Sequence, residues 1–356
     1  MRGTRTLLQQ RQHGSPLAYA TQLVRKTDLD SLWSVLLYPK SVRPAYLCLR
    51  AFNVELATIE DQVSNPIVGR MRYQWWRDTV KQTFEHRPPN HPIAELLHSL
   101  PQLDQLSAYH LQRIINARER HFLNPHFHSL RDLAEYSAST QSSLLYLLLQ
   151  ATATPIPSSS SSPSTSTSPQ EAMSTGKRHE KLFQHVGHEH DHDPTSSSAR
   201  ASSGPDTKEV DDLTLDHAAS HIAVTNTIAT LLRSIPHHAQ KRINVMPTEI
   251  ASRYDLKEET LFRQGPSTPG LKEAVATMVG IAHAELRTAR SCFEGTTGIP
   301  QRARPVFLSV TPARSWLERL ANADGERAFD VFDPRVLRQD WKLPFQVWRD
   351  SRRSVF

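Results

Sequence analysis

Apolar residues recur at intervals of three and four along most of the chain, which places them on one face of a helix. Few β-branched runs are bounded by turns, and glycine is scarce. The pattern therefore predicts an all-α fold of about ten helices. The expected helices cover residues 28–38, 41–63, 66–84, 92–100, 103–122, 129–149, 213–235 and 271–293, with others starting near 248 and 311.

Proline and short polar residues mark where several of these helices begin and end. The sequence Ser64-Asn65-Pro66 offers a polar cap followed by proline at the first helical position, where the missing N–H costs nothing. Ser129 and Asp132 have the spacing of a capping box. Pro236 is expected to end the helix over 213–235, because proline removes a backbone donor and clashes with the preceding turn.

Residues 153–210 differ from the rest in composition, being rich in Ser, Pro and His. Such a segment buries too little apolar surface to offset the entropy of ordering it, so we predict a disordered insert. A transition-metal site within the insert is one interpretation, and a solvated low-complexity tract is the other. The side chains concerned are His185, His188, His190, Asp191, His192 and Asp193. Residues 28–152 and 211–320 are expected to form one helical domain, with 321–356 as a tail packed on it.

The first 27 residues contain Arg, Lys, Ser, Thr and Leu but no acidic residue, a composition typical of a mitochondrial transit peptide. An ordinary disordered basic N-terminus is the alternative. These residues carry five of the positive charges, so the formal charge of +6 falls to +1 without them. A nearly neutral body argues against nucleic-acid binding.

Two further features of the composition narrow the class of protein. No run of 18 or more apolar residues occurs, so we expect no membrane-spanning helix. The two cysteines, Cys48 and Cys292, suit a reducing compartment, and both are expected to be small core residues.

The candidate chemistry lies in residues 50–78, where an acidic helix precedes a helix with Arg and Trp. Glu55, Glu60 and Asp61 lie on the first helix, and Trp75 and Trp76 lie on the second. Two adjacent helical residues point about 100° apart, so the two indoles cannot face one core. Either both lie in helix–helix contacts, or one faces a pocket.

Three stretches, residues 50–61, 69–78 and 226–247, resemble the squalene and phytoene synthase family. The resemblance implies an isoprenoid-synthase-like helical bundle around a central cavity. It also implies two aspartate-rich motifs on facing helices, each with Asp at i and i+4, that hold Mg²⁺ ions for a substrate diphosphate. The match retains Arg233, Ala239, Arg242 and Pro247 of the second motif.

The expected metal-binding carboxylates are largely missing from this match. Ala57 stands at the first aspartate position and Asp61 at the second, while Ser234 and His238 replace both aspartates of the second motif. Serine and imidazole are poor ligands for Mg²⁺. We therefore predict a protein that is not an enzyme and needs no cofactor or metal. The alternative is an active prenyl transferase with an altered metal set through the carboxylates of residues 55–61.

The degraded motifs, the leader and the RMRYQWWRD stretch together resemble a mitochondrial, non-catalytic branch of the family. The resemblance to this branch implies a factor for assembly of respiratory complex I on the matrix side of the inner membrane. The implied partners are complex I subunits or other assembly factors, with peripheral association with the inner membrane. The scaffold is expected to bind either a protein partner or a lipid-like ligand.

The side chains expected to line the cavity or a partner-binding surface come from four predicted helices. For the arginines, one interpretation is a cradle for a phosphate or an acidic partner, and the other is pairing with the carboxylates of residues 55–61. In the tail, Trp341, Phe345 and Trp348 could touch a membrane or pack on the domain. The candidate residues are Arg43, Arg50, Asn53, Glu55, Glu60, Asp61, Arg72, Trp75, Trp76, Tyr136 and Arg233.

Overall fold

The computed structural model describes residues 14–153, 209–353 and 356, and over these residues it has helices and no strand, which confirms the predicted all-α fold. Residues on both sides of the insert pack into one compact unit. The helices are α2 (Pro16–Thr27), α3 (Leu29–Ser34), α4 (Arg43–Gln62), α5 (Pro66–Phe84), α6 (Pro92–His98), α7 (Ala108–Leu123), α8 (Leu130–Ser137), α9 (Ser143–Ala153), α10 (Asp212–Gln240), α11 (Thr248–Arg253), α12 (Glu258–Gln264), α13 (Leu271–Ser291), α14 (Arg304–Phe307), α15 (Thr311–Ala321), α16 (Pro334–Leu337) and α17 (Leu343–Arg353).

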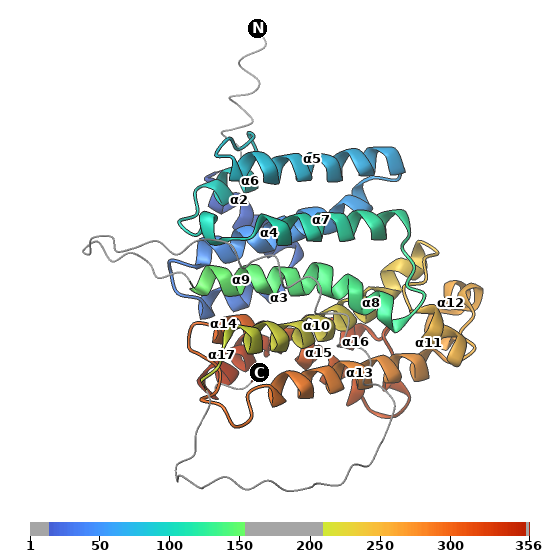
Figure 1. Cartoon of the computed structure of the whole chain (residues 1–356). Coiled ribbons are helices and arrows are strands. Elements are labelled where there is room, and N and C mark those ends of the chain that lie inside the picture. The colour runs from blue at the N-terminus through green and yellow to red at the C-terminus, as the bar shows by residue number, and fades with distance from the viewer. Residues whose placement is uncertain (1–13, 154–208, 354–355) are drawn as a thin grey trace, which may run out of the picture. The chain divides into compact units, whose positions relative to one another are not determined.

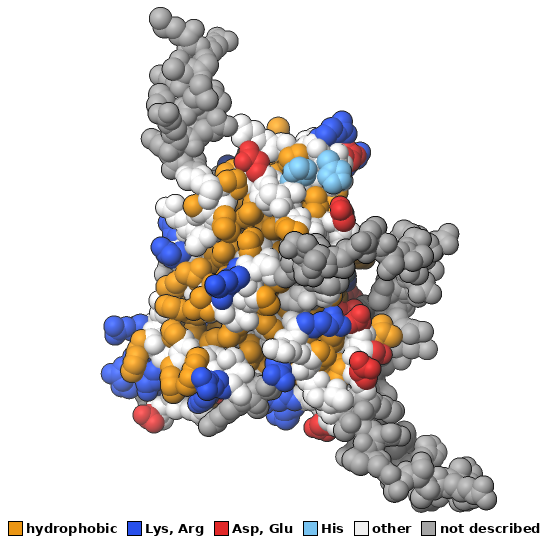
Figure 2. Space-filling model, turned by 90° about the vertical axis from the view of Figure 1, so that its left-hand side faces the viewer, with side chains coloured by type: hydrophobic (Ala, Val, Ile, Leu, Met, Phe, Trp, Pro, Cys, Tyr) orange, Lys and Arg blue, Asp and Glu red, His pale blue; other side chains and the backbone are white. Residues whose placement is uncertain are grey.

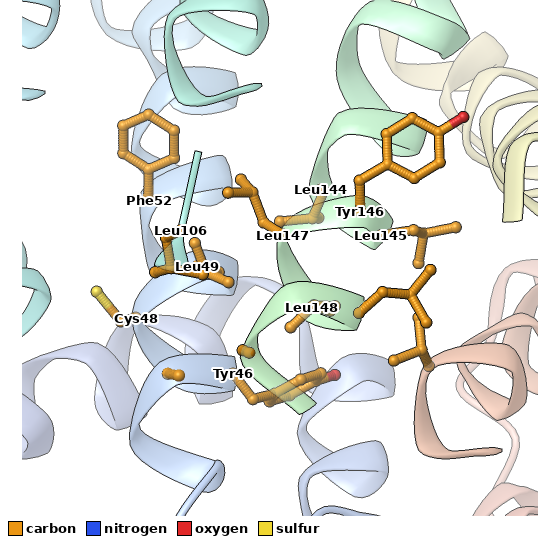
Figure 3. Close-up of a cluster of buried hydrophobic side chains, with 14 of the residues drawn as sticks. Tyr46, Cys48, Leu49, Phe52, Leu106, Leu144, Leu145, Tyr146, Leu147 and Leu148 are labelled. Carbon is orange, nitrogen blue, oxygen red and sulfur yellow. The ribbon is translucent and has the colours of Figure 1, made fainter. Parts of the chain in front are cut away.

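The core has two apolar clusters, which share the long helix α10. The first joins α4, α7 and α9 with the first half of α10, and the second joins the later part of α10 with α13 and α15. Figure 1 shows α7, α9, α10 and α13 as successive rows. In Figure 3, Leu49 of α4 and Leu147 of α9 extend into the space between the two helices.

Helix α2 corrects the expectation of a disordered leader over residues 1–27. It packs against α4 and α6, and Ala20 and Val24 are fully buried on its inner face. Ser15 caps the helix by accepting a hydrogen bond from the N–H of Ala18. The leader composition did not reveal that two apolar side chains four residues apart form a buried stripe. Residues 1–13 lie outside the described residues.

Local sequence signals account for the starts of α5 and α8. Asn65 caps α5, accepting a 2.9 Å hydrogen bond from the N–H of Ile67, and Pro66 is its first residue. Ser129 and Asp132 form the predicted capping box. The expected single helix over 129–149 is interrupted by a π turn, Ala138–Ser142, between α8 and α9.

Pro236 does not end α10, contrary to prediction; the helix continues to Gln240 with the proline inside it. Packing holds the additional turn, since Ala239 is 7% exposed and belongs to the second apolar cluster. This continuation carries His237 and His238 to the end of α10 that faces α4.

The predicted insert, residues 153–210, falls mostly outside the described residues, as does its His and Asp tract. At its edges, Ala153 belongs to α9 and Val210 is buried against the first cluster. Within the described ranges, no helix is sufficiently long and apolar to span a bilayer.

Candidate functional site

The C-terminal ends of α4 and α10 face each other through charged side chains. Glu60 Oε1 lies 3.6 Å from His238 Nε2. Asp61 Oδ1 lies 2.5 Å from Lys241 Nζ and 3.3 Å from His237 Nε2. The family pattern expects carboxylates on both helices at this place. Here α4 supplies the carboxylates, and the chain at the end of α10 supplies the nitrogen bases that meet them.

The contact between Glu60 and His238 shifts both pKa values in the direction that keeps the pair charged. The interaction with His238 lowers the pKa of the Glu60 carboxyl, although burial opposes the shift. Glu60 in turn raises the pKa of His238, and the carbonyl of Ser234, 3.0 Å from His238 Nδ1, adds to that effect. For Asp61, burial acts to raise the pKa, but the hydrogen bonds from Lys241 and His237 together lower it.

A second polar group, contributed by α4, α7 and α8, includes the predicted cavity residues Asn53 and Tyr136. Arg118 Nη2 donates a 3.2 Å hydrogen bond to Asn53 Oδ1, and its guanidinium carbon lies 5.7 Å from the centre of the Tyr136 ring. His121 stacks on Phe127 at 4.8 Å between ring centres and lies 4.9 Å from the Tyr136 ring. The candidate Tyr136 is therefore held between a cation and an imidazole.

Burial governs protonation in this second group. It lowers the pKa of His121 to about 4, with Glu60 opposing the shift and Arg118 reinforcing it. It also raises the pKa of Tyr136. At neutral pH His121 and Tyr136 are therefore uncharged, and of the two histidines near Glu60 it is His238 that holds a proton more readily.

Two of the predicted arginines pair with carboxylates on or next to α3. Arg50 Nε donates a 3.1 Å hydrogen bond to Asp28, just before that helix, and Arg233 Nη1 donates a 2.9 Å bond to Asp30. The Arg233 guanidinium also lies 5.2 Å from the centre of the Trp316 ring. These contacts fix the N-terminal part of the domain to α4 and α10.

The other two arginines bind neutral acceptors. Arg43 donates to the carbonyls of Tyr38 and Leu36 at 3.0 and 3.2 Å, and Arg72 Nη1 donates to Gln62 Oε1 at 2.7 Å. The predicted pairing of the four arginines with the carboxylates of residues 55–61 is therefore wrong. Geometry explains this for Arg50, which lies about 15 Å before Glu60 along the same helix.

Trp75 and Trp76 point in different directions. Trp76 is 5% exposed and packs edge-on against Phe52, with ring centres 5.3 Å apart, whereas Trp75 is 41% exposed. Both indoles contact His91, at 5.3 and 5.1 Å between ring centres. The interpretation that both indole side chains lie in helix–helix contacts is confirmed for Trp76 and wrong for Trp75. Glu55 also turns away from the facing ends, accepting a 2.6 Å hydrogen bond from Tyr19 of α2.

The sequence reasoning missed four residues of the site: Arg118, His121, His237 and Lys241. Arg118 and His121 lie three positions apart on α7, so they share one helix face, and this spacing was the available signal. Lys241 follows His237 and His238 in a basic cluster. Because the helix was predicted to end at Pro236, this cluster was assigned to an irregular segment.

The residues at the facing helix ends do not fit a diphosphate-bound magnesium cluster. Such a cluster needs several carboxylates directed at the ions, and here Glu60 and Asp61 already neutralise cationic side chains. Over the residues that the structure describes, no group of three or more His, Cys, Asp or Glu side chains is arranged to hold a metal ion. The arrangement joins the ends of α4 and α10 through pairs of oppositely charged side chains.

The all-α bundle has an isoprenoid-synthase fold, as comparison with solved structures shows. The fold is similar to a dehydrosqualene synthase, with a TM-score of 0.65 at 12% identity over 96% of this chain and 97% of that one. A squalene synthase, HpnC from Alicyclobacillus acidocaldarius, matches with a TM-score of 0.60 at 13% identity over 86% of this chain and 92% of that one. The chain belongs to the squalene/phytoene synthase family, whose model matches residues 24–342.

Within the family, the chain is similar to proteins named for a role in respiratory-chain assembly. It is 28% identical to "NADH dehydrogenase (ubiquinone) complex I, assembly factor 6" of Rattus norvegicus, over 95% of this chain and 82% of that protein. The protein of that name from Homo sapiens is 27% identical over the same shares, and the Drosophila melanogaster homolog is 26% identical over 97% and 86%.

Proposed function

We propose that this chain is a non-catalytic member of its family that assists the assembly of mitochondrial respiratory complex I. Support comes from the relatives, which carry that name and align over nearly the whole chain. The structural observation that supports the non-catalytic part is the Glu60–His238 contact, because it pairs a carboxylate of α4 with a basic side chain of α10. Location on the matrix side of the inner membrane, with residues 1–13 acting within a transit peptide, belongs to the same proposal.

The partners in this proposal are complex I subunits or other assembly factors, and the scaffold acts by binding. A lipid-like ligand would contact the polar group around Arg118 and Tyr136, because this group contains two of the predicted cavity residues, Asn53 and Tyr136. The alternative of an active prenyl transferase requires Glu55, Glu60 and Asp61 to be available for metal. Their hydrogen bonds and ion pairs with Tyr19, His238 and Lys241 argue against that alternative.

The decisive experiment removes the protein from cells and resolves the respiratory complexes. We expect a selective fall in assembled complex I, with the other complexes retained, and recovery when the wild-type chain is restored. Normal complex I in cells that lack the protein would overturn the proposal.

A separate assay tests the non-catalytic part. Purified protein incubated with Mg²⁺ and farnesyl or geranylgeranyl diphosphate is expected to form no product. If product forms, its loss in a triple variant, Glu55→Gln, Glu60→Gln and Asp61→Asn, would assign the activity to this site and reject the non-catalytic proposal.

A further inference from the structure

Helix α17 has an inner face that packs on the domain and an outer face that carries aromatic rings. Leu343 and Val347 on the inner face are each 3% exposed. On the outer side Phe345 is 62% and Trp348 50% exposed, and Trp341, just before the helix, is 81% exposed. Three large aromatic side chains in water within eight residues exceed the scattered apolar exposure that is normal for a surface.

The acidic side chains of this segment face the domain, and the basic side chains beside the aromatic rings face the solvent. Both acids between residues 334 and 352 turn inward: the side chain of Asp340 is 11% exposed, and that of Asp350, which is paired with Arg314, is 6% exposed. Lys342 and Arg352 are exposed. Lys342 Nζ lies 5.5 Å from the centre of the Trp341 ring, and the Arg352 guanidinium lies 4.9 Å from that of Trp348. The outer surface therefore combines aromatic rings with positive charge.

A groove beside α17 extends this surface. It has a volume of about 450 Å³ and lies between α17, α14 and the 3-10 turn Val35–Leu37. Its lining includes Trp33, Leu37 and Pro305, and no acidic residue, and Leu36 at its rim is 63% exposed. Figure 2 views the side on which α17 lies in Figure 1, and in its lower part Lys and Arg side chains stand among hydrophobic ones.

We propose that this aromatic–basic surface, made of Leu36, Trp341, Lys342, Phe345, Trp348 and Arg352, docks on a bilayer that contains anionic phospholipids. Aromatic rings partition into the headgroup boundary, and flanking Lys and Arg bind lipid phosphates, which is the physical basis of attachment by an interfacial amphipathic helix. The groove gives apolar parts of a lipid a place to bind without distorting the domain. Charge complementarity favours an anionic bilayer over an uncharged apolar partner, because the exposed charges around the rings are all positive from residue 341 to 352.

This inference deepens the proposed peripheral association with the inner membrane, on which it rests, by naming the surface and the lipid class. Vesicle binding by the purified chain involves no respiratory complex. A failure of the vesicle assay would therefore leave the complex I proposal standing, and normal complex I in deficient cells would leave vesicle binding unaffected.

The test is co-sedimentation of the full chain with vesicles of phosphatidylcholine, with or without about 20 mol% phosphatidylglycerol, at low and high salt. We expect binding to the anionic vesicles that weakens with salt, and little binding to phosphatidylcholine alone. The charge variant Lys342→Glu/Arg352→Glu and the aromatic variant Trp341→Ser/Phe345→Ser/Trp348→Ser should each lower binding at least about tenfold. All five positions are exposed, and thermal unfolding would verify that the variants are folded.

Matched controls change equally exposed residues on α5, away from α17. Ile67→Ser/Met71→Ser/Trp75→Ser removes the exposed apolar stripe there, and Arg70→Glu/Lys81→Glu reverses charge; both should bind like wild type. Equal binding to neutral vesicles, full binding by either α17 variant, or equal loss in the controls would overturn the proposal. So would a wild-type dimer that becomes a monomer in the aromatic variant, because the surface would then be an interface between copies.

Discussion

At the scale of single residues, His238 faces Glu60 with a positive charge only while its imidazole is protonated. Glu60 raises the pKa of His238 in the folded protein. The stabilisation from His238 is therefore fully present below the pKa of the unfolded state, and it is lost as pH rises through the raised pKa of the folded state. The pKa of the Glu60 carboxyl is lowered, so its contribution to stability is fully present above the ordinary carboxyl pKa. That contribution is lost as pH falls through the lowered pKa of the folded state. The pair therefore stabilises the protein most strongly in mildly acidic solution.

The corresponding prediction concerns His238→Gln. Its loss in unfolding free energy should be largest near pH 6, at most about 1 kcal/mol because both side chains are partly exposed, and should shrink toward pH 8. Urea unfolding at a series of pH values measures this. An exposed histidine just before α8 provides the control His128→Gln, which should show no such trend. A loss that grows with pH would contradict the assigned protonation.

The sequence predicted substitutions in the family motifs but not the contacts that these residues make. The prediction for Ala57, Ser234 and His238 rests on motif spacing along a helix, which is local information. It could not show that His238 would meet Glu60, because that depends on how α4 and α10 approach. Arg118 carried no motif, so its hydrogen bond to Asn53 became visible only in three dimensions.

At the scale of elements, α5 and α7 approach closely at Gly69. A Cβ atom there would lie 2.2 Å from a ring carbon of Phe122, so the ring would have to move. Gly69→Ala should therefore destabilise the protein by about 1–2 kcal/mol, the cost of overpacking less the helix-propensity gain.

Gly280 of α13 is the matched control, because a Cβ atom there meets nothing within 4 Å. Gly280→Ala should stabilise the protein by about 0.5–1 kcal/mol through helix propensity alone. Thermal unfolding of both variants measures the contrast. Equal shifts of the same sign would show that α5 and α7 do not pack closely at Gly69.

The predicted helices were most accurate where signals were local and least accurate where packing overrode them. The start of α5 follows from Asn65 and Pro66. The extra turn of α10 past Pro236 could not be predicted, because burial of Ala239 offsets the cost of a proline inside the helix. The π turn Ala138–Ser142 has no signal in a pattern that counts intervals of three and four.

At the scale of the whole molecule, the fold class followed from periodicity, whereas the arrangement of the helices followed only from family resemblance. Periodicity gives each helix an apolar face but does not say which faces meet. Helix α10 contributes to both apolar clusters, and this arrangement depends on contacts between residues that are far apart in the chain. The tail illustrates the same limit: Leu343 and Val347 pack on the domain, whereas the aromatic residues Trp341, Phe345 and Trp348 stay exposed, and periodicity alone did not say which would be buried.

The N-terminus provides the last prediction. Helix α2 buries Ala20 and Val24 completely, and Tyr19 hydrogen-bonds to Glu55. Removal of residues 1–27 should therefore destabilise the chain by about 3 kcal/mol or more relative to removal of residues 1–13, because the longer deletion opens a cavity beside α4 and α6. If a transit peptide is cleaved, N-terminal sequencing of the mature protein should place the cut before Ser15, so that the cap of α2 survives. A mature protein that begins beyond Ala20, and is as stable as the longer chain, would show that α2 is not part of the working fold.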